Sequence, residues 1–414
     1  MKILILGGGV AGMNVMAHLR RKHDVILLEK ESSPGGLLRT FKDNGYTYDI
    51  TGHLIHSLTG EFQKFISAAG IELQNIKRKA AVFVENKYID YPIQLNIPQL
   101  STEMKNTITD QILKSEPLSV SRELDFETWV RSIFGDALAE LFFIPYNGKL
   151  FNTHISDISS NWFSRYLPVP DKVEFIRSLA GKYGNDAGYN ASFNYPPSGG
   201  IEILPQKMYG LLKDNIILDK EITKIDTVKK EIFCGDEKFT YDALISTIPF
   251  PEFLRLSGKG KSLKPCWVNV HDLNVGVSAA DFPHHWAYYP QSELPFYRIG
   301  SFSNIAPHLA PDGKHSFYIE TSYRDNAPDK DKILKAVESL GIFAVSDIES
   351  IVEINIKYAY PIHNKDYPAI KSFMKSAASD GIHFYGRSGS WEYLSISDIF
   401  NRSSLFLKAI NKQR

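Results

Sequence analysis

Cysteine is nearly absent from this sequence, whose 414 residues include only Cys234 and Cys266. Two cysteines so far apart exclude a disulfide framework and a cysteine-rich metal cluster, and they suit a reducing compartment. We therefore expect a cytoplasmic protein without a bound metal.

An excess of either charge is also absent, since 47 Lys and Arg residues balance 47 Asp and Glu residues. No overall field attracts nucleic acid or an acidic membrane surface. We expect no nucleic-acid partner, and any anion site must be made by a few local arginines.

Long apolar runs are missing as well. None reaches the roughly 20 residues that a membrane-spanning helix needs, so we expect no membrane span. The apolar N-terminal segment carries little basic charge and runs into glycines, which favours a strand of the mature protein over a secretion signal. The length of the chain allows two or three domains with a substantial core.

The most informative pattern lies near the start of the chain. The apolar run Lys2–Leu6 is typical of a buried parallel strand. A GxGxxG motif at 7–12 follows, then a helical pattern over 13–21, and then a second apolar run over 24–28 that ends at Glu29. This order predicts a dinucleotide-binding βαβ unit.

The residue types of this unit have chemical reasons. Gly7 permits the tight turn, Gly9 lets the backbone approach a pyrophosphate, and Gly12 lets the helix lie close to the strand. The phosphates would meet the positive end of the helix dipole, and Glu29 would accept hydrogen bonds from a ribose. A second glycine pair, Gly35-Gly36, indicates FAD rather than a nicotinamide cofactor, because FAD is long enough to need backbone contact beyond its ribose.

The pattern then changes several times and predicts an α/β protein. We expect a Rossmann-like FAD-binding domain, an inserted helical domain and an antiparallel β-sheet substrate domain. The FAD-binding domain is expected in three segments, at 1–75, 191–255 and 371–414. The sheet domain is expected at 76–98 and 256–370, and the helical substrate domain at 99–190. A hairpin is expected at 81–92, with Glu85-Asn86 at its turn.

Two further segments contain candidate site residues. Gly52 indicates backbone pressed against a flat group such as a flavin ring, and His53 and His56 follow it. Two histidines at a strand end are equally well explained as ordinary polar residues. The run Phe142–Phe151 carries aromatics on both sides of a proline, although aromatics at helical spacing are more often core than a ligand platform.

These motifs together resemble the FAD-dependent UDP-galactopyranose mutases, within the wider protoporphyrinogen-oxidase-like and amine-oxidase-like flavoproteins, over nearly the whole chain. The glycine motifs and Glu29 fit any member of this superfamily. The segment 52–56 looks like the mutase motif beside the flavin, and 91–96 looks like the segment that carries an active-site asparagine. The segment 142–151 is similar to the mutase helix that stacks the uracil.

The resemblance implies specific site residues. The residues expected to act in catalysis are Arg165, Arg387, Tyr360, Tyr393 and His53. The residues expected to bind substrate are Asn96, Phe142, Tyr146, Phe151 and Arg298. The residues expected to contact FAD are Gly7, Gly9, Val10, Ala11, Gly12, Glu29, Lys30, Gly35, Gly36, Leu37, Gly52, His53, Ile222, Thr247, Gly386, Arg387 and Asp398.

The sequence also departs from the mutase pattern. Phe151 stands where the mutases have tryptophan, and the segment 388–398 is longer than the corresponding mutase loop. Another mutase tyrosine has two candidate counterparts, Tyr183 and Tyr189.

The resemblance implies a pyranose–furanose mutase that acts on a nucleotide-diphosphate sugar, such as UDP-galactose or a related hexose or deoxyhexose, in cell-surface polysaccharide or glycoconjugate biosynthesis. In that mechanism N5 of reduced FAD is the covalent nucleophile, and NAD(P)H is the expected reductant. Arg165 and Arg387 would hold the departing diphosphate, Tyr360 and Tyr393 would donate hydroxyl hydrogen bonds, and closure of the segment 181–192 would exclude water.

Two other readings remain open at this stage. One is an FAD-dependent oxidoreductase of the protoporphyrinogen-oxidase or amine-oxidase type, and the other is a catalytically silent nucleotide-sugar-binding protein. The sequence does not decide between a monomer and a homo-oligomer, nor does it name the sugar or its nucleotide.

Overall fold

The computed structural model describes residues 1–114, 124–160, 167, 169–181 and 191–411. Five short parallel strands form the first of its two main sheets, in the order β19–β13–β1–β2–β9. They are β1 (Lys2–Leu6), β2 (Asp24–Leu28), β9 (Ile216–Ile217), β13 (Ala243–Ser246) and β19 (Ile382–Phe384). The two strands predicted from the apolar runs at 2–6 and 24–28 are confirmed.

Both faces of this parallel sheet are covered, which explains the unbroken apolar run in β1. Ile3 and Ile5 pack against one side, and Leu4 and Leu6 pack against the other. The first side is covered by α1 (Val10–Leu19), α2 (Gly60–Ala68), α7 (Ile203–Leu212) and α13 (Ile396–Asn411). The second side is covered by α8 (Phe250–Ser257), α11 (Tyr367–Ser379), β10 (Lys224–Asp226), β11 (Glu231–Cys234) and β12 (Glu237–Thr240).

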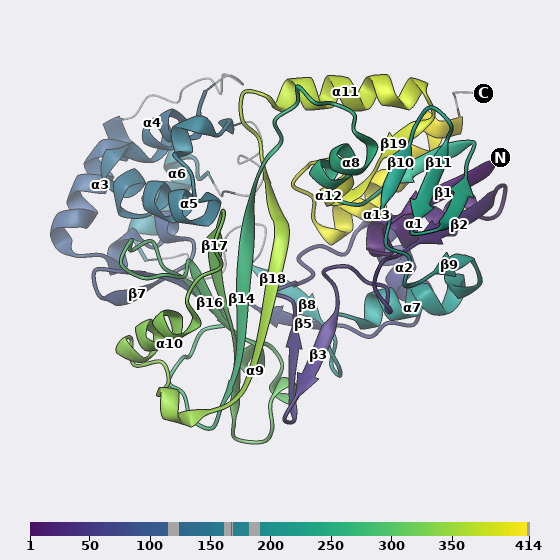
Figure 1. Ribbon diagram of the computed structural model, residues 1–414. Helices are drawn as coiled ribbons and strands as arrows, with labels where there is room; N and C mark the ends of the chain where they lie inside the picture. The colour runs from purple at the N-terminus through teal and green to yellow at the C-terminus, as the bar shows by residue number, and fades with distance from the viewer. Residues whose placement is uncertain (115–123, 161–166, 168, 182–190, 412–414) are drawn as a thin grey trace.

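The second main sheet has seven strands in the order β18–β14–β17–β16–β15–β6–β7. They are β6 (Ala80–Val84), β7 (Lys87–Asp90), β14 (Cys266–Val277), β15 (Trp286–Tyr288), β16 (Arg298–Ser301), β17 (His315–Tyr323) and β18 (Ile348–Ile362). Adjacent strands are antiparallel, as predicted, except that β15 and β6 run parallel. Figure 1 shows the long strands β14 and β18 running between the two halves of the molecule.

The two faces of the seven-stranded sheet have different partners. On one face, Leu273 and Ile319 pack against α10 (Lys330–Ser339). On the other face lies the hairpin of β3 (Thr40–Asp43) and β4 (Tyr46–Asp49), and Tyr46 occupies the space above Gly276 of β14. The chain that leaves β4 therefore continues across this second face.

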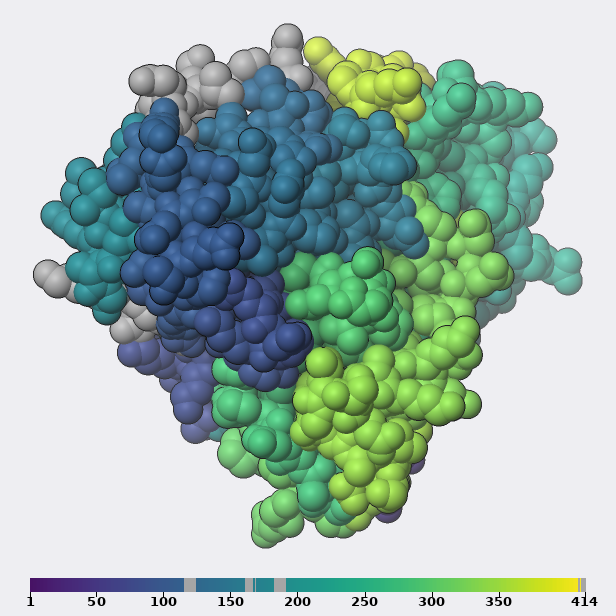
Figure 2. Space-filling view, turned by 90° about the vertical axis from the view of Figure 1, so that its left-hand side faces the viewer, coloured from purple at the N-terminus to yellow at the C-terminus, as the bar shows by residue number. Residues whose placement is uncertain are grey.

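The helical segment forms a separate layer at the upper left of Figure 1 and covers the upper part of the face shown in Figure 2. Its described elements are α3 (Thr102–Lys114), α4 (Phe126–Leu138), η3 (Ala139–Phe143, a π-helical turn), α5 (Ile144–Phe151), η4 (Ile155–Asp157) and α6 (Lys172–Leu179). The helices predicted for this part of the chain are confirmed within the described residues.

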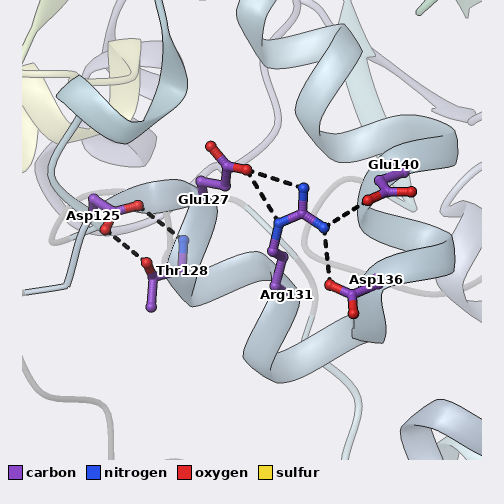
Figure 3. Close-up of polar contacts among 6 residues, drawn as sticks. All are labelled: Asp125, Glu127, Thr128, Arg131, Asp136 and Glu140. Carbon is purple, nitrogen blue, oxygen red and sulfur yellow. Dashed lines mark hydrogen bonds and ion pairs between the residues drawn. The ribbon is translucent and has the colours of Figure 1, made fainter.

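A kink at Gly135 sets the direction of η3 and α5. Gly135 has φ 77° and ψ 165°, which are not helical. Arg131 bridges the kink, because its guanidinium group binds Glu127 before Gly135, at 3.0 Å, and Asp136 and Glu140 after it, each at 2.9 Å (Figure 3). Asp125 caps the start of α4 by accepting a hydrogen bond from the Thr128 backbone N–H.

Small elements complete the fold. They are β5 (Gln74–Lys77) paired with β8 (Ser192–Tyr195), α9 (Phe302–Ile305), α12 (Gly386–Gly389), and the 3₁₀ turns η1 (Ile93–Leu95), η2 (Ile97–Gln99), η7 (Lys213–Asn215), η8 (Pro307–Leu309) and η9 (Val345–Asp347). The hairpin β6–β7 turns at Glu85 and Asn86, whose φ angles of 50° and 55° confirm the predicted turn. Among the described residues, no helix has the length and apolar character needed to cross a membrane.

Replacement of Gly300 by alanine tests the packing of the seven-stranded sheet. A Cβ atom at Gly300 would lie 2.0 Å from Cζ of the buried Tyr318 ring. We expect Gly300→Ala to lower the free energy of unfolding by about 1–3 kcal/mol, because the ring must move. Gly210→Ala is the matched control, since Gly210 lies in α7 with no neighbour near its Cβ position. Urea unfolding should show the control to be more stable than the parent by about 0.5–1 kcal/mol.

Candidate functional site

The glycine turn after β1 packs directly on the second glycine pair. A Cβ atom at Gly12 would lie 2.1 Å from the Gly7 carbonyl oxygen, so only glycine lets α1 begin this close to β1. The Gly35 N–H donates to the Gly8 carbonyl oxygen at 2.9 Å, and a Cβ atom at Gly36 would lie 3.3 Å from the Gly9 Cα. The two glycine segments form one backbone surface without side chains.

Glu29 lies at the end of β2, beside this surface. Its Oε2 accepts a hydrogen bond from the Gly8 N–H at 2.5 Å, and its Oε1 accepts one from the Glu31 N–H at 3.0 Å. The carboxylate is 8% exposed and is therefore placed by the backbone at a fixed point near the turn. An open backbone cradle with an adjacent acid and the N-terminus of α1 fits the pyrophosphate and ribose of FAD.

The other residues predicted to contact FAD lie in different surroundings. Val10 and Ala11 begin α1, and Thr247 donates its hydroxyl hydrogen to the Leu6 carbonyl oxygen at 2.8 Å. Leu37 and Ile222 pack against apolar clusters. Lys30 lies at the surface in an ion pair with Glu31.

Gly386 brings a second chain segment to the start of α1. Its φ is 78°, and a Cβ atom there would lie 2.4 Å from the Ala11 Cβ. Glycine therefore allows α12 to begin against α1. The next residue, Arg387, is carried to the edge of the dinucleotide turn.

Arg387 is held by aromatic faces rather than by an acid. Its guanidinium carbon lies 4.0 Å from the Tyr393 ring centre and 5.2 Å from the Tyr360 ring centre. The two rings are nearly parallel, at 14°, with centres 6.0 Å apart. Arg387 donates a hydrogen bond to the Ala359 carbonyl oxygen at 3.4 Å, and within the described part of the chain it forms no ion pair. This guanidinium group is suited to receive an anion.

The aromatic run of the helical segment reaches the same place. The Phe151 and Tyr360 rings are nearly perpendicular, at 82°, with centres 6.2 Å apart. Phe142 and Tyr146 stack with centres 5.2 Å apart, and Tyr146 makes an edge contact with Tyr288 of β15. Phe142 and Phe151 are 3% and 1% exposed, so both rings also belong to the core.

Arg324, at the end of β17, ties α5 to the sheet. Its guanidinium group donates to the carbonyl oxygens of Phe151 and Asn152, each at 3.2 Å, and also to that of Trp267. These bonds satisfy carbonyl groups at the C-terminal end of α5. The aromatic run is therefore positioned by the seven-stranded sheet.

Arg298 has a different environment from that of Arg387. Glu320 binds two of the three guanidinium nitrogens of Arg298, through an Nε–Oε2 contact and an Nη2–Oε1 hydrogen bond of 2.6 Å. Glu320 is fully buried, and the guanidinium carbon also lies 5.7 Å from the Tyr318 ring centre. The charge of Arg298 is thus largely balanced within the protein.

His53 is held in one tautomer by its own turn. Nδ1 lies 2.5 Å from the Ile50 carbonyl oxygen, which can only accept a hydrogen bond, so Nδ1 carries the proton and Nε2 is an acceptor. Burial lowers the pKa of His53 to about 4, with smaller contributions from Arg387 and Arg298. Burial likewise lowers the pKa of His56 to about 4. Both imidazoles are neutral at pH 7.

The remaining predicted residues occupy defined places. Asn96 is buried, and its amide donates to the Pro92 carbonyl oxygen at 3.0 Å. Asp398 accepts hydrogen bonds from the backbone and hydroxyl groups of Ser395 at the start of α13. The contacts proposed for these residues with substrate and FAD stay predictions. Arg165, Tyr183, Tyr189 and most of the segment 181–192 lie outside the described residues.

Sequence reasoning missed the residues that line the sheet beneath this site. Tyr318 is one of them, since its hydroxyl oxygen would lie 2.4 Å from a Cβ atom at Gly52. The predicted contact of Gly52 with a flavin ring stays a prediction. Glu320 and Asp272 were also missed, although each is the one acidic residue of its strand. That pattern was the one available signal, because an acid in a buried strand requires a partner.

Comparison with known proteins agrees with this geometry. The family model described as "Flavin containing amine oxidoreductase" matches residues 10–269, and the chain belongs to this family. A crystal structure of reduced UDP-galactopyranose mutase has 25% sequence identity and a TM-score of 0.88, with 100% of this chain and 94% of that chain covered. The protein is therefore a flavoprotein enzyme with FAD as its cofactor, as predicted.

Two further matches differ in how much of the chain they share. Cyclohexylamine oxidase from Brevibacterium oxydans IH-35A has 13% identity and a TM-score of 0.71, with 100% of this chain and 99% of that chain covered, which shows a shared fold. A 4,4'-diapophytoene desaturase from Staphylococcus aureus (strain COL) is 27% identical over 131 residues, 31% of this chain. The match spans a quarter of that relative's length.

The pKa of His53 predicts a pH-dependent stability. As the pH falls from about 6.5 to about 4, His53 takes up a proton in the unfolded chain before it does so in the folded protein, so stability is lost. Between pH 7 and pH 4.5 the unfolding free energy of both proteins should fall. We expect the fall in His53→Gln to be smaller than that in the parent by about 1–2 kcal/mol. Urea unfolding at both pH values measures the difference, in which the contributions of other titrating groups cancel. Parallel pH profiles would contradict the assignment of a buried neutral imidazole.

Proposed function

We propose that the protein is a flavin-dependent mutase that interconverts the pyranose and furanose rings of a nucleotide-diphosphate sugar, such as UDP-galactose or a related hexose or deoxyhexose. One observation carries this proposal. Arg387 stands beside the dinucleotide turn with its guanidinium group against Tyr360 and Tyr393, while Phe151 approaches from the helical segment. Segments from three parts of the fold thus converge on one cation that no ion pair within the described residues neutralises.

The diphosphate of such a substrate matches this cation. A mutase must release the anomeric carbon from a diphosphate and later return it, so the leaving group has to be held without escaping. Arg387 would bind the diphosphate oxygens through its fork of N–H donors, which stays charged at any working pH. Tyr360 and Tyr393 would donate hydroxyl hydrogen bonds without adding charge. Arg165 is proposed to close on the diphosphate from the helical segment.

The other residues would orient the substrate and the cofactor. Bound FAD, in its reduced form, supplies a nucleophilic nitrogen for the anomeric carbon. His53 would present the Nε2 lone pair of a neutral ring and so orient a donor group without competing for a proton. Phe142 and Tyr146 would stack the nucleotide base, Phe151 and Asn96 would contact the sugar, and Arg298, balanced by Glu320, would offer its remaining N–H group.

The likeness over the full chain to reduced UDP-galactopyranose mutase supports this choice. NAD(P)H is the proposed reductant, and biosynthesis of cell-surface polysaccharides or glycoconjugates is the proposed setting. The replacement of the mutase tryptophan by Phe151 points to a sugar contact with a smaller ring at that position.

Arg387→Ala tests the assignment of the diphosphate site. We expect kcat/KM with dithionite-reduced protein and a nucleotide sugar to fall by about a hundredfold or more, because charge-assisted hydrogen bonds to the leaving group are lost. The ratio of flavin absorbance to protein should stay at the parent value. Arg255→Ala is the control, since Arg255 is an exposed arginine paired with Glu252 on α8. An Arg387→Ala protein with the turnover of the parent would show that the diphosphate lies elsewhere.

The family match to amine oxidoreductases supports a second candidate, an FAD-dependent oxidoreductase that takes a hydride from its substrate. The two candidates differ in the state of flavin that they need. A mutase forms furanose products only after the flavin has been reduced, whereas an oxidoreductase bleaches its own oxidised flavin when substrate is added. Anaerobic incubation with a panel of nucleotide sugars, followed by product analysis and flavin absorbance, separates the two.

A further inference from the structure

Asp272 is a buried carboxyl group in the middle of the seven-stranded sheet. It lies on β14 directly opposite Glu320 of β17, which in turn lies opposite Arg298 of β16. Residues opposite one another across neighbouring strands point to the same face, with Cβ atoms about 5 Å apart. Asp272, Glu320 and Arg298 therefore form one transverse row, and both acids are fully buried.

The charges in this row do not balance if both acids are ionised. The guanidinium group of Arg298 is bound in a two-point contact to Glu320. Burial, reinforced by the neighbouring Glu320, raises the pKa of Asp272 well above its usual range. Its Oδ1 has no hydrogen-bond partner among the described residues. The raised pKa favours the neutral carboxylic acid form of Asp272, and Oδ1 is the oxygen that can carry the proton without breaking a bond.

The other oxygen of Asp272 holds a turn of unusual backbone geometry. Oδ2 accepts hydrogen bonds from the Thr51 backbone N–H at 2.8 Å and from the Asn274 amide at 3.2 Å. Thr51 has a φ of 56°, in the left-handed region that a β-branched residue rarely adopts. Such a residue keeps this conformation only where its surroundings enforce it, and the bond to Asp272 reaches it from the sheet.

The turn that Asp272 holds is the one that carries His53. The His53 N–H donates to the Thr51 carbonyl oxygen at 3.0 Å. The imidazole Nδ1 contacts the Ile50 carbonyl oxygen at 2.5 Å and the Thr51 hydroxyl at 3.1 Å. Between these residues, Gly52 lies against the Tyr318 ring on the neighbouring strand. Both of these Nδ1 contacts thus come from within a turn seated on β14 and β17.

We propose that Asp272 is a positioning residue that holds the Thr51–His53 turn against the sheet and thereby sets the orientation of the His53 imidazole toward bound FAD. The proposal rests on the placement of His53 beside the flavin in the proposed function. It does not depend on whether the enzyme is a mutase or an oxidoreductase, because either reaction uses the same cofactor.

The first test compares two variants of Asp272 with FAD bound. Asp272→Ala removes the acceptor for the Thr51 N–H, and we expect the midpoint potential and the visible absorbance spectrum of the flavin to shift. Asp272→Asn keeps both an acceptor and a neutral group, so its potential and spectrum should match those of the parent. If Asp272→Asn shifts the potential as much as Asp272→Ala does, a negative charge rather than a hydrogen bond is responsible, and the proposal is wrong.

The second test asks whether Asp272 acts through His53. His53→Ala should shift the flavin potential in the same direction as Asp272→Ala, and the double variant should shift it no further than His53→Ala alone. Additive shifts would contradict the proposal. A shift in His53→Ala with none in Asp272→Ala would also overturn it, while leaving His53 beside the flavin. If neither variant shifts the potential, the placement of His53 beside the flavin and the positioning role of Asp272 are both wrong, whatever the result of the Arg387 assay.

Thr51→Gly supplies a folded background for these comparisons. Glycine adopts a φ near 56° without strain, so the turn should keep its shape there without help from Asp272. We expect Asp272→Ala to shift the potential less in the Thr51→Gly protein than in the parent, and an equal shift would contradict the role of the turn. Leu273→Ala is the matched control, since Leu273 is buried next to Asp272 but faces α10. It should lower the unfolding midpoint and leave the flavin potential unchanged.

Discussion

Contact between backbone and backbone at the two glycine segments is the constraint on which the cofactor site depends. Gly9 and Gly36 meet without side chains, and the Gly35 N–H closes the contact on the Gly8 carbonyl oxygen. A side chain on either segment would separate them and open the surface that receives the pyrophosphate. Gly386 applies the same principle to α12, so the arginine that follows it reaches the edge of this surface.

The fold gives its two central arginines different electrostatic states. Arg298 faces a buried carboxylate and contributes to the sheet as half of an ion pair. Arg387 faces the ring surfaces of Tyr360 and Tyr393, which attract a cation without accepting hydrogen bonds from its N–H groups in the ring plane. Removing Arg298 would leave Glu320 charged and buried, whereas removing Arg387 leaves no buried charge behind. Arg298 therefore stabilises the fold, whereas Arg387 is available to bind a ligand.

How much the sequence could predict follows from the distance over which each interaction acts. The strand, turn and helix around Gly12, Glu29 at the end of β2, and the turn at Glu85 depend on near neighbours in the chain, and these were predicted correctly. The contact between Gly52 and Tyr318 was not predicted, because the register of the seven-stranded sheet brings Tyr318 to this position. Asp272 and Thr51 are likewise far apart in sequence, and only the packing of the β3–β4 hairpin on that sheet joins them.

The strand order of the parallel sheet has a consequence for how the protein is made. β1 pairs with β2 at once, but its other neighbour is β13, and β13 is in turn completed by β19. While the chain is still emerging from a ribosome, the glycine turn is present from the start, yet α12 that packs against it arrives only after residue 386. Long-range pairing of this kind forms slowly. FAD therefore meets its complete enclosure only late in synthesis, and until then the unpaired edges of β1 and β2 are open to aggregation.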